Sequence, residues 1–148
     1  MLGMAIRDLS SIKDGIVRCL SKRREIQAVY IFGSFASGRS RINSDIDIAV
    51  LLNPKSLRLE SLDYRLKLAA EISSAIGRSN VDLVILNEAP PVLAHQVLSK
   101  GQLVFERSAS ARVDFEVRTV NAYLDTEPMR ALYRSYLKKR IREGKIFG

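Results

Sequence analysis

Two acidic residues interrupt an apolar run of the sequence that has the composition of a strand. The run "DIDIAVLL" (residues 45–52) carries Asp45 and Asp47 two positions apart among isoleucine, valine and leucine. Because alternate residues of a strand point to the same face, the two carboxylates should project together, and Ile46 and Ile48 should project to the other face. Carboxylates held together in a buried strand repel each other, so the pattern favours a positive charge between them.

Magnesium is the cation that suits such oxygen ligands. Mg²⁺ needs only one or two protein carboxylates and completes its shell with water and phosphate oxygens. A third acid, Asp82, lies in another apolar run, "VDLVIL" (81–86). If the two predicted strands pair side by side, Asp82 comes alongside Asp45 and Asp47. The three carboxylates are therefore our candidate metal site.

A glycine–serine pair supplies the second half of the predicted site. Gly33 and Ser34 directly follow the apolar run "AVYIF" (28–32). A glycine after a strand lets the backbone turn sharply and approach a ligand closely. If residues 34–38 begin a short helix, its free N–H groups and the Ser34 hydroxyl suit a phosphate group. A phosphate cradle next to metal-binding carboxylates is typical of metal-assisted phosphoryl or nucleotidyl transfer.

Hydrophobic periodicity predicts the elements that position these residues. The C-terminal helical segment contains Pro128, which lacks an N–H group and must kink or split the helix. The predicted fold class is α/β, a small mixed sheet of three or four strands with packed helices. We expect one domain over 1–148, with a core at 26–106 and a helical extension at 107–148. The expected strands are 28–32, 45–52, 81–86 and a fourth candidate at 102–106, and the expected helices are 2–21, 59–76, 90–101 and the segment from 110 onward.

The composition is that of a soluble globular protein. The chain has 148 residues, of which 47% are hydrophobic and 27% charged. No apolar stretch approaches the roughly 20 residues that span a bilayer, and the N-terminus lacks the apolar core of a signal peptide. Cys19 is the only cysteine, which excludes an intrachain disulfide and a cysteine-cluster metal site. We expect a cytoplasmic protein without membrane contact.

The net charge of +8 lies outside the predicted core. Residues 26–106 carry eight basic and eight acidic side chains, whereas residues 107–148 carry ten basic and five acidic ones. A basic periphery favours anionic partners such as nucleic acid or an acidic protein face, and a solvated basic surface explains it equally well.

The order of these features is more specific than any one of them. A strand, Gly-Ser, a step of eleven residues from Ser34 to Asp45, an Asp-x-Asp strand and a third strand bearing Asp82 follow one another. This set resembles the signature of the DNA-polymerase-β-like nucleotidyltransferase superfamily. Within it, "GSFASGRSRINSDIDIAV" is similar to the minimal nucleotidyltransferases (MNT), and the resemblance covers residues 27–87.

The resemblance implies a role for each site residue. Asp45 and Asp47 would hold two Mg²⁺ ions and Asp82 would be the third carboxylate, with ATP as the substrate. Many MNT proteins carry Arg at the position of Ser37, and Arg39 and Arg41 are close enough in sequence to replace its charge. The residues that would contact the nucleotide are Gly33, Ser34 and Ser44.

The chain length and the tail "RSASARVDFEVRTVNAYLD" are most similar to the antitoxin of HEPN/MNT toxin–antitoxin modules. That resemblance implies AMP transfer to a tyrosine of a HEPN ribonuclease toxin within a hetero-oligomer, and direct binding of nucleic acid is not favoured. Two other functions stay open: an antitoxin that binds a toxin without catalysis, and a nucleotidyltransferase that modifies a small molecule. An Asp-x-Asp glycosyltransferase would need a longer sheet than this chain can form.

The C-terminal tyrosines and the single histidine have two possible roles. Tyr123, Tyr133 and Tyr136 alternate with Arg and Lys, so they could form a docking face for a macromolecular acceptor. They could also pack into the core beneath a helix that covers the sheet, and both roles can hold together. We expect His95 to be a packing or surface residue and not a catalytic base.

Overall fold

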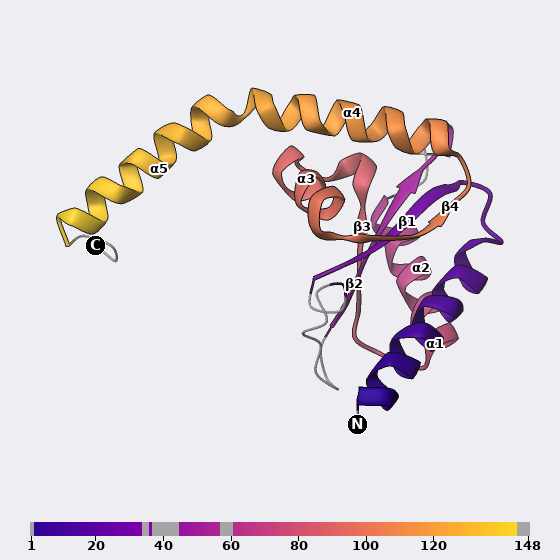
Figure 1. Cartoon of the computed structure of the whole chain (residues 1–148). Helices are drawn as coiled ribbons and strands as arrows, with labels where there is room; N and C mark the ends of the chain where they lie inside the picture. Colours follow the sequence, from indigo (N-terminus) through magenta and orange to yellow (C-terminus); the bar gives the residue numbers. More distant parts are fainter. Residues whose placement is uncertain (1, 34–35, 37–44, 57–60, 145–148) are drawn as a thin grey trace.

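The computed structural model describes residues 2–33, 36, 45–56 and 61–144, and these contain a four-stranded mixed sheet (Figure 1). The strand order is β3-β2-β1-β4. β1 pairs antiparallel with β2 and β4, whereas β2 pairs parallel with β3, and α2 makes the crossover that a parallel pair requires. The strands are β1 (Ile26–Phe32), β2 (Ile46–Leu52), β3 (Val81–Ile85) and β4 (Gln102–Glu106).

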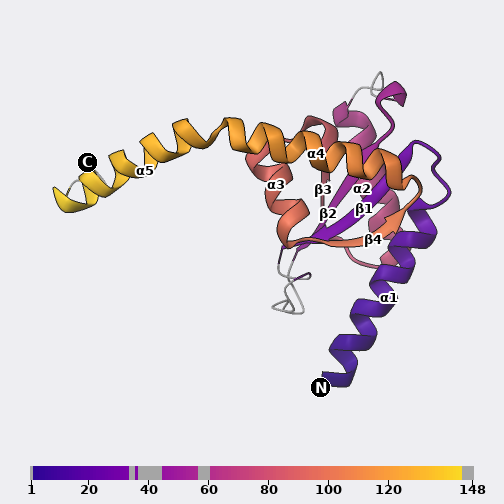
Figure 2. The same cartoon turned by 45° about the horizontal axis from the view of Figure 1, so that its top comes forward.

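Helices cover both faces of the sheet, and one helix leaves it. α1 and α2 pack on one face and α3 and α4 on the other, while α5 projects away from the sheet (Figures 1 and 2). In the described ranges no helix is both long and apolar enough to cross a membrane. The helices are α1 (Leu2–Leu20), α2 (Ser61–Ile76), α3 (Pro91–Lys100), α4 (Ala109–Asp125) and α5 (Glu127–Arg142), with short 3₁₀ turns η1 (Pro54–Ser56) and η2 (Leu86–Glu88).

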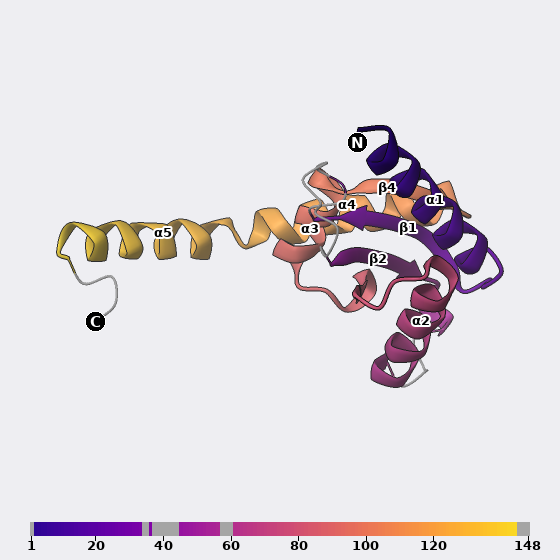
Figure 3. The same ribbon diagram turned by 90° about the horizontal axis from the view of Figure 1, so that it is seen from below.

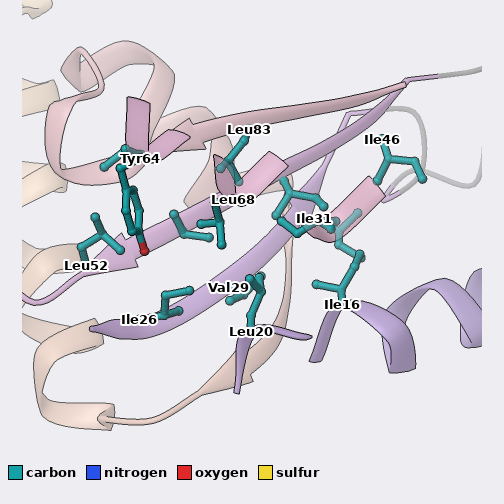
Figure 4. Close-up of a cluster of buried hydrophobic side chains, with 14 of the residues drawn as sticks. Ile16, Leu20, Ile26, Val29, Ile31, Ile46, Leu52, Tyr64, Leu68 and Leu83 are labelled. Atoms are coloured by element: carbon teal, nitrogen blue, oxygen red, sulfur yellow. The ribbon is translucent and has the colours of Figure 1, made fainter. Parts of the chain in front are cut away.

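The larger hydrophobic core lies between the sheet and helices α1 and α2 (Figure 4). Alternate strand residues, among them Ile31 of β1 and Ile48 of β2, point into it and are fully buried. Ile16 from α1 and Leu68 from α2 close it from the other side. Burying side chains of this size contributes about 1.5–3 kcal/mol each, so this face is the main source of fold stability.

The opposite face holds a smaller core and a polar anchor. Ala28 and Tyr30 of β1 pack there with Val97 of α3. The Tyr30 hydroxyl donates a hydrogen bond to the Glu116 carboxylate (3.2 Å), which also pairs with Arg112 (2.8 Å). Burial, and then the negative charge of Glu116, raises the pKa of Tyr30, so this hydroxyl keeps its proton and ties α4 to the sheet.

The predicted elements are confirmed with small shifts at their ends. β1 begins at Ile26, two residues earlier than predicted, and the fourth strand candidate is β4. Pro128 does split the C-terminal helix. α4 ends at Asp125, Thr126 is the residue between the two helices, and Pro128 lies in the first turn of α5. Proline is tolerated in a first turn because the N–H groups there have no intrahelical partner, so α5 starts anew in another direction.

Of the two roles left open for the C-terminal tyrosines, packing into the core does not apply to Tyr133 and Tyr136. Tyr133 and Tyr136 lie on α5 and are 62% and 51% exposed. Tyr123 lies on α4 and stacks on the ring of His95 in α3, with the ring centroids 3.6 Å apart. His95 is thus a packing residue as predicted, and Tyr133 and Tyr136 remain available to a partner.

Two leucines of α2 test the larger core. Leu68→Ala should lower the free energy of unfolding by about 2–5 kcal/mol, because the fully buried side chain leaves a cavity. Leu66→Ala, on the same helix but 60% exposed, is the matched control and should change it by no more than about 0.5 kcal/mol. Equal losses in urea-induced unfolding would contradict the placement of α2.

Candidate active site

The parallel pairing of β2 with β3 places Asp47 directly beside Asp82. The next residues in register, Ile48 and Leu83, both point into the core beneath α1 and α2. Because strand residues alternate, both aspartates project to the opposite face, the one that carries α3 and α4. The predicted adjacency of the second and third strands is therefore confirmed.

Asp45 lies one residue before β2 and belongs to the same charged cluster. Burial raises the pKa of the Asp47 carboxyl, and the negative charges of Asp82 and Asp45 raise it further. The prediction that these acids are buried is wrong for Asp45 and Asp82, which are exposed, while Asp47 is half-buried. All three lie where β2 and β3 begin, and two of the three acids are exposed to solvent there.

Gly33 brings the end of β1 against the same carboxylate. Its φ of +72° lies in the left-handed region that favours glycine. A Cβ atom at this position would collide with the Asp47 carboxylate. Phe32 pairs with Asp47 across the antiparallel strands, which brings the glycine there. The sharp turn predicted at Gly33 is present, and the glycine lies against the Asp47 carboxylate. Its predicted close approach to a ligand stays a prediction.

A second glycine near this edge was missed from the sequence. Gly101 follows α3, and a Cβ there would meet the Val97 carbonyl oxygen and lie 3.3 Å from the Ile31 carbonyl oxygen and 3.4 Å from Phe32 Cβ. The turn from α3 into β4 thus packs against the end of β1 that leads to Gly33. The sequence marked Gly101 only as a helix end, because nothing local indicates its contact with a residue seventy positions earlier.

Several predicted site residues lie outside the described residues, and their roles stay predictions. They are Ser34, Ser44, Ser37, Arg39 and Arg41. Within the described part of the chain, no group of three His, Cys, Asp or Glu side chains is arranged to hold a metal ion. The joint role of Asp45, Asp47 and Asp82 as metal ligands therefore also stays a prediction.

The donor set nevertheless suits a hard divalent cation. The charged neighbours that shift the pKa of Asp47 are both acids. Carboxylate oxygens are preferred ligands of Mg²⁺, and a cation between Asp47 and Asp82 would remove the repulsion that raises this pKa. This donor chemistry is the reason we expect a cation at the cluster.

A known family model matches the part of the chain that contains these residues. The sequence matches the family model described as "Polymerase beta, Nucleotidyltransferase" over residues 14–110, which include Gly33 and the three aspartates. The chain belongs to this nucleotidyltransferase family. The match covers the sheet and the helices α2 and α3, and α5 lies beyond it.

Similar nucleotidyltransferases are protein adenylyltransferases. The chain is 38% identical to protein adenylyltransferase MntA of Shewanella oneidensis over 101 residues, 67% of each chain. It is 26% identical to protein adenylyltransferase MntA of Aphanizomenon flos-aquae over 121 residues, 78% of this chain and 80% of that one.

Solved structures of toxin–antitoxin complexes share the fold of this nucleotidyltransferase. One, a toxin–antitoxin with AMP-PNP, matches with a TM-score of 0.67 and 29% identity over 84% of this chain and 98% of that chain. Another is the tri-AMPylated Shewanella oneidensis HEPN toxin in complex with its MNT antitoxin, with a TM-score of 0.68 and 27% identity over 87% and 98% of the two chains. The predicted fold class and the resemblance to MNT antitoxins are confirmed.

A pair of glycine substitutions tests the contact between Gly33 and Asp47. Gly33 and Gly77 both have positive φ, but only a Cβ at Gly33 would collide with a described atom. Both alanine variants should lose about 1 kcal/mol of stability through backbone strain. Only Gly33→Ala should lower nucleotidyl transfer, by on the order of 10-fold or more, because it displaces Asp47. Equal transfer rates for the two variants would show that the contact is unimportant.

The stability of the wild-type chain relative to Asp47→Asn should depend on pH in a defined direction. The pKa of Asp47 is raised in the native state. Between its ordinary and its raised value, the native wild-type chain therefore binds more protons than the unfolded chain. The stability of the wild-type chain falls as pH rises through that window. At pH 7 without divalent metal, Asp47→Asn should therefore unfold at a temperature a few degrees above that of the wild-type chain, and the difference should vanish below about pH 4.

Thermal unfolding scans at both pH values measure this effect. Asp114→Asn is the control, since Asp114 is an exposed acid on α4 outside the cluster. Added Mg²⁺ should stabilise the wild-type chain more than Asp47→Asn. A variant that is less stable than wild type at neutral pH would contradict the assigned repulsion.

Proposed function

We propose that this chain is a Mg²⁺-dependent protein adenylyltransferase. It transfers AMP from ATP to a tyrosine hydroxyl of a HEPN-type toxin in the cytoplasm, forms a hetero-oligomer with that toxin and acts as its antitoxin. The observation that carries the proposal is the register that pairs Asp47 with Asp82 while Gly33 lies against the Asp47 carboxylate. The similarity of the chain to MntA adenylyltransferases, and to an MNT antitoxin solved in complex with an AMPylated HEPN toxin, supports the choice of substrate.

In this proposal all three carboxylates would hold the metal, and Asp82 also accepts a proton. Asp45, Asp47 and Asp82 would hold the metal, which when bound lowers the pKa of the acceptor hydroxyl and balances the charge of the phosphates. The tyrosine oxygen attacks the α-phosphorus of ATP, the bond from that phosphorus to the bridging oxygen breaks, and pyrophosphate leaves. The hydroxyl proton passes to Asp82, which is exposed near the start of β3 and can meet an incoming acceptor.

Gly33 gives the triphosphate room beside these acids. Its exposed backbone, without a side chain, lets a phosphate group approach the end of β1 closely. In this proposal Gly33, Ser34 and Ser44 contact the triphosphate. A negatively charged substrate next to an acidic cluster needs the metal, so nucleotide binding and metal binding should depend on each other.

Catalysis explains the acidic cluster better than docking alone. Burial, and then the negative charges of Asp82 and Asp45, raise the pKa of Asp47, so keeping this carboxylate ionised costs stability in the absence of a cation. A module that only binds a toxin gains nothing from that cost. The cluster therefore favours an enzyme over a non-catalytic antitoxin.

Incorporation of radiolabelled AMP tests the proposed function. The purified chain is mixed with a HEPN-type toxin, Mg²⁺ and labelled ATP, and mass spectrometry locates the modified residue. Asp47→Asn and Asp82→Asn should each lower transfer by at least on the order of 100-fold, since the charge that develops in the transition state loses its stabilisation. Glu88→Gln, an exposed acid at the other end of β3, is the control and should transfer as wild type.

Two results would overturn the proposal. Equal labelling by wild type and Asp47→Asn would remove the carboxylates from the reaction. Transfer to a small molecule in the absence of any partner protein would change the acceptor class.

A further inference from the structure

The projecting helix α5 carries an apolar face that the rest of the described chain leaves exposed. In all three overall views α5 extends away from the sheet (Figures 1, 2 and 3). Large contiguous apolar patches are rare on soluble monomers and mark interaction sites. The residues of this face, which we call the α5 face, are Met129 (77% exposed), Leu132 (73%), Tyr133 (62%), Tyr136 (51%) and Leu137 (39%).

The α5 face is one continuous stripe with a basic surround. Its members follow the spacing i, i+3, i+4, i+7 and i+8, which places them on the same side of a helix. The helix has six basic residues and one acidic residue. Arg140 borders the stripe, since its guanidinium lies 5.6 Å from the centroid of the Tyr136 ring and donates a hydrogen bond to the Tyr136 hydroxyl (2.8 Å). The pattern fits an apolar contact with an acidic rim on the partner.

Contacts at the base of α5 hold it in a fixed direction. The Arg130 guanidinium lies 3.9 Å from the centroid of the Tyr123 ring and donates hydrogen bonds to the Tyr123 carbonyl (3.1 Å) and the Thr126 hydroxyl (2.8 Å). The Tyr123 ring is stacked on His95 with 4° between the ring planes. Three helices are thus joined at one point, and a surface held in place before binding loses little entropy when it binds.

The direction of α5 matches the location of the active site. α5 extends past the end of the sheet where β1 ends and β2 begins (Figure 3). Gly33 and Asp47 lie at that end. α5 also continues from α4, which covers the face to which Asp47 and Asp82 project. A protein bound along α5 would therefore lie in front of the carboxylates.

We propose that the α5 face docks the HEPN-type toxin and holds its acceptor tyrosine at the edge formed by Asp47 and Asp82. This inference rests on the proposed function for the identity of the partner. A second copy of this chain is a poorer occupant, because it would bring six more basic residues against the same basic helix. The family match ends at residue 110, so the nucleotidyltransferase fold itself does not account for α5.

Substitutions on opposite sides of α5 test the docking surface. The variant carrying Leu132→Asp and Tyr136→Asp should bind the HEPN-type toxin on the order of 100-fold more weakly than wild type, because charges replace two central contacts. Ser135→Asp, exposed on another side of the same helix, is the matched control and should bind as wild type. Calorimetry on the full chain measures affinity, and circular dichroism checks that each variant remains folded.

A charge change tests the acidic rim separately. The variant carrying Lys139→Glu should lower affinity by about 10-fold and weaken its dependence on salt, since Lys139 is exposed beside the α5 face. Unchanged affinity in the Leu132→Asp, Tyr136→Asp variant would overturn the docking surface. So would a wild-type dimer that this variant converts to a monomer without loss of toxin binding, because a second copy would then occupy the face.

The two proposals fail in different ways. If Asp47→Asn abolishes transfer but the α5 variants bind and transfer as wild type, the proposed function stands and the docking surface is wrong. If the α5 variants lose binding but wild type transfers no AMP, the docking surface stands and the enzymatic proposal is wrong.

Discussion

The parallel pairing of β2 with β3 sets the position of the acidic cluster. The pairing is secured at both ends: the Ile46 N–H donates to the Asn80 carbonyl (2.9 Å), and the Asn87 side chain exchanges hydrogen bonds with the Leu52 backbone (2.8 and 2.9 Å). A slip of one residue would turn every side chain of β3 to the other face and separate Asp82 from Asp47. The position of Asp82 next to Asp47 therefore depends on this register.

The same register is enforced by the larger core. Ile48 and Leu83 are buried on the α1 and α2 side, and strand alternation therefore turns the neighbouring aspartates to the other face. Any register that buried the aspartates would expose these side chains to water and lose their burial energy. Hydrophobic burial on one face thus offsets the cost of placing Asp47 near two other negative charges.

One face of the sheet mainly stabilises the fold, and the other carries the residues of the proposed site and docking surface. The larger core lies on the α1 and α2 face. The other face carries the acids, the stacked rings of Tyr123 and His95, and the projecting α5. Polar contacts such as Tyr30 with Glu116 fix α4 there without a large core. Residues that meet a substrate or partner can then vary without loss of the main stabilising contacts.

Local patterns in the sequence determined the elements, the turn at Gly33 and the common face of Asp45 and Asp47, because strand alternation and helix periodicity need no distant residue. They also pointed to Asp82, but only the tertiary pairing decided its register with Asp47, the contact at Gly101 and the exposure of the cluster edge. Tyr133 and Tyr136 have the spacing of core residues, and the structure left them exposed because α5 extends past the sheet (Figure 1). Burial depends on which surface lies opposite, and no local pattern contains that information.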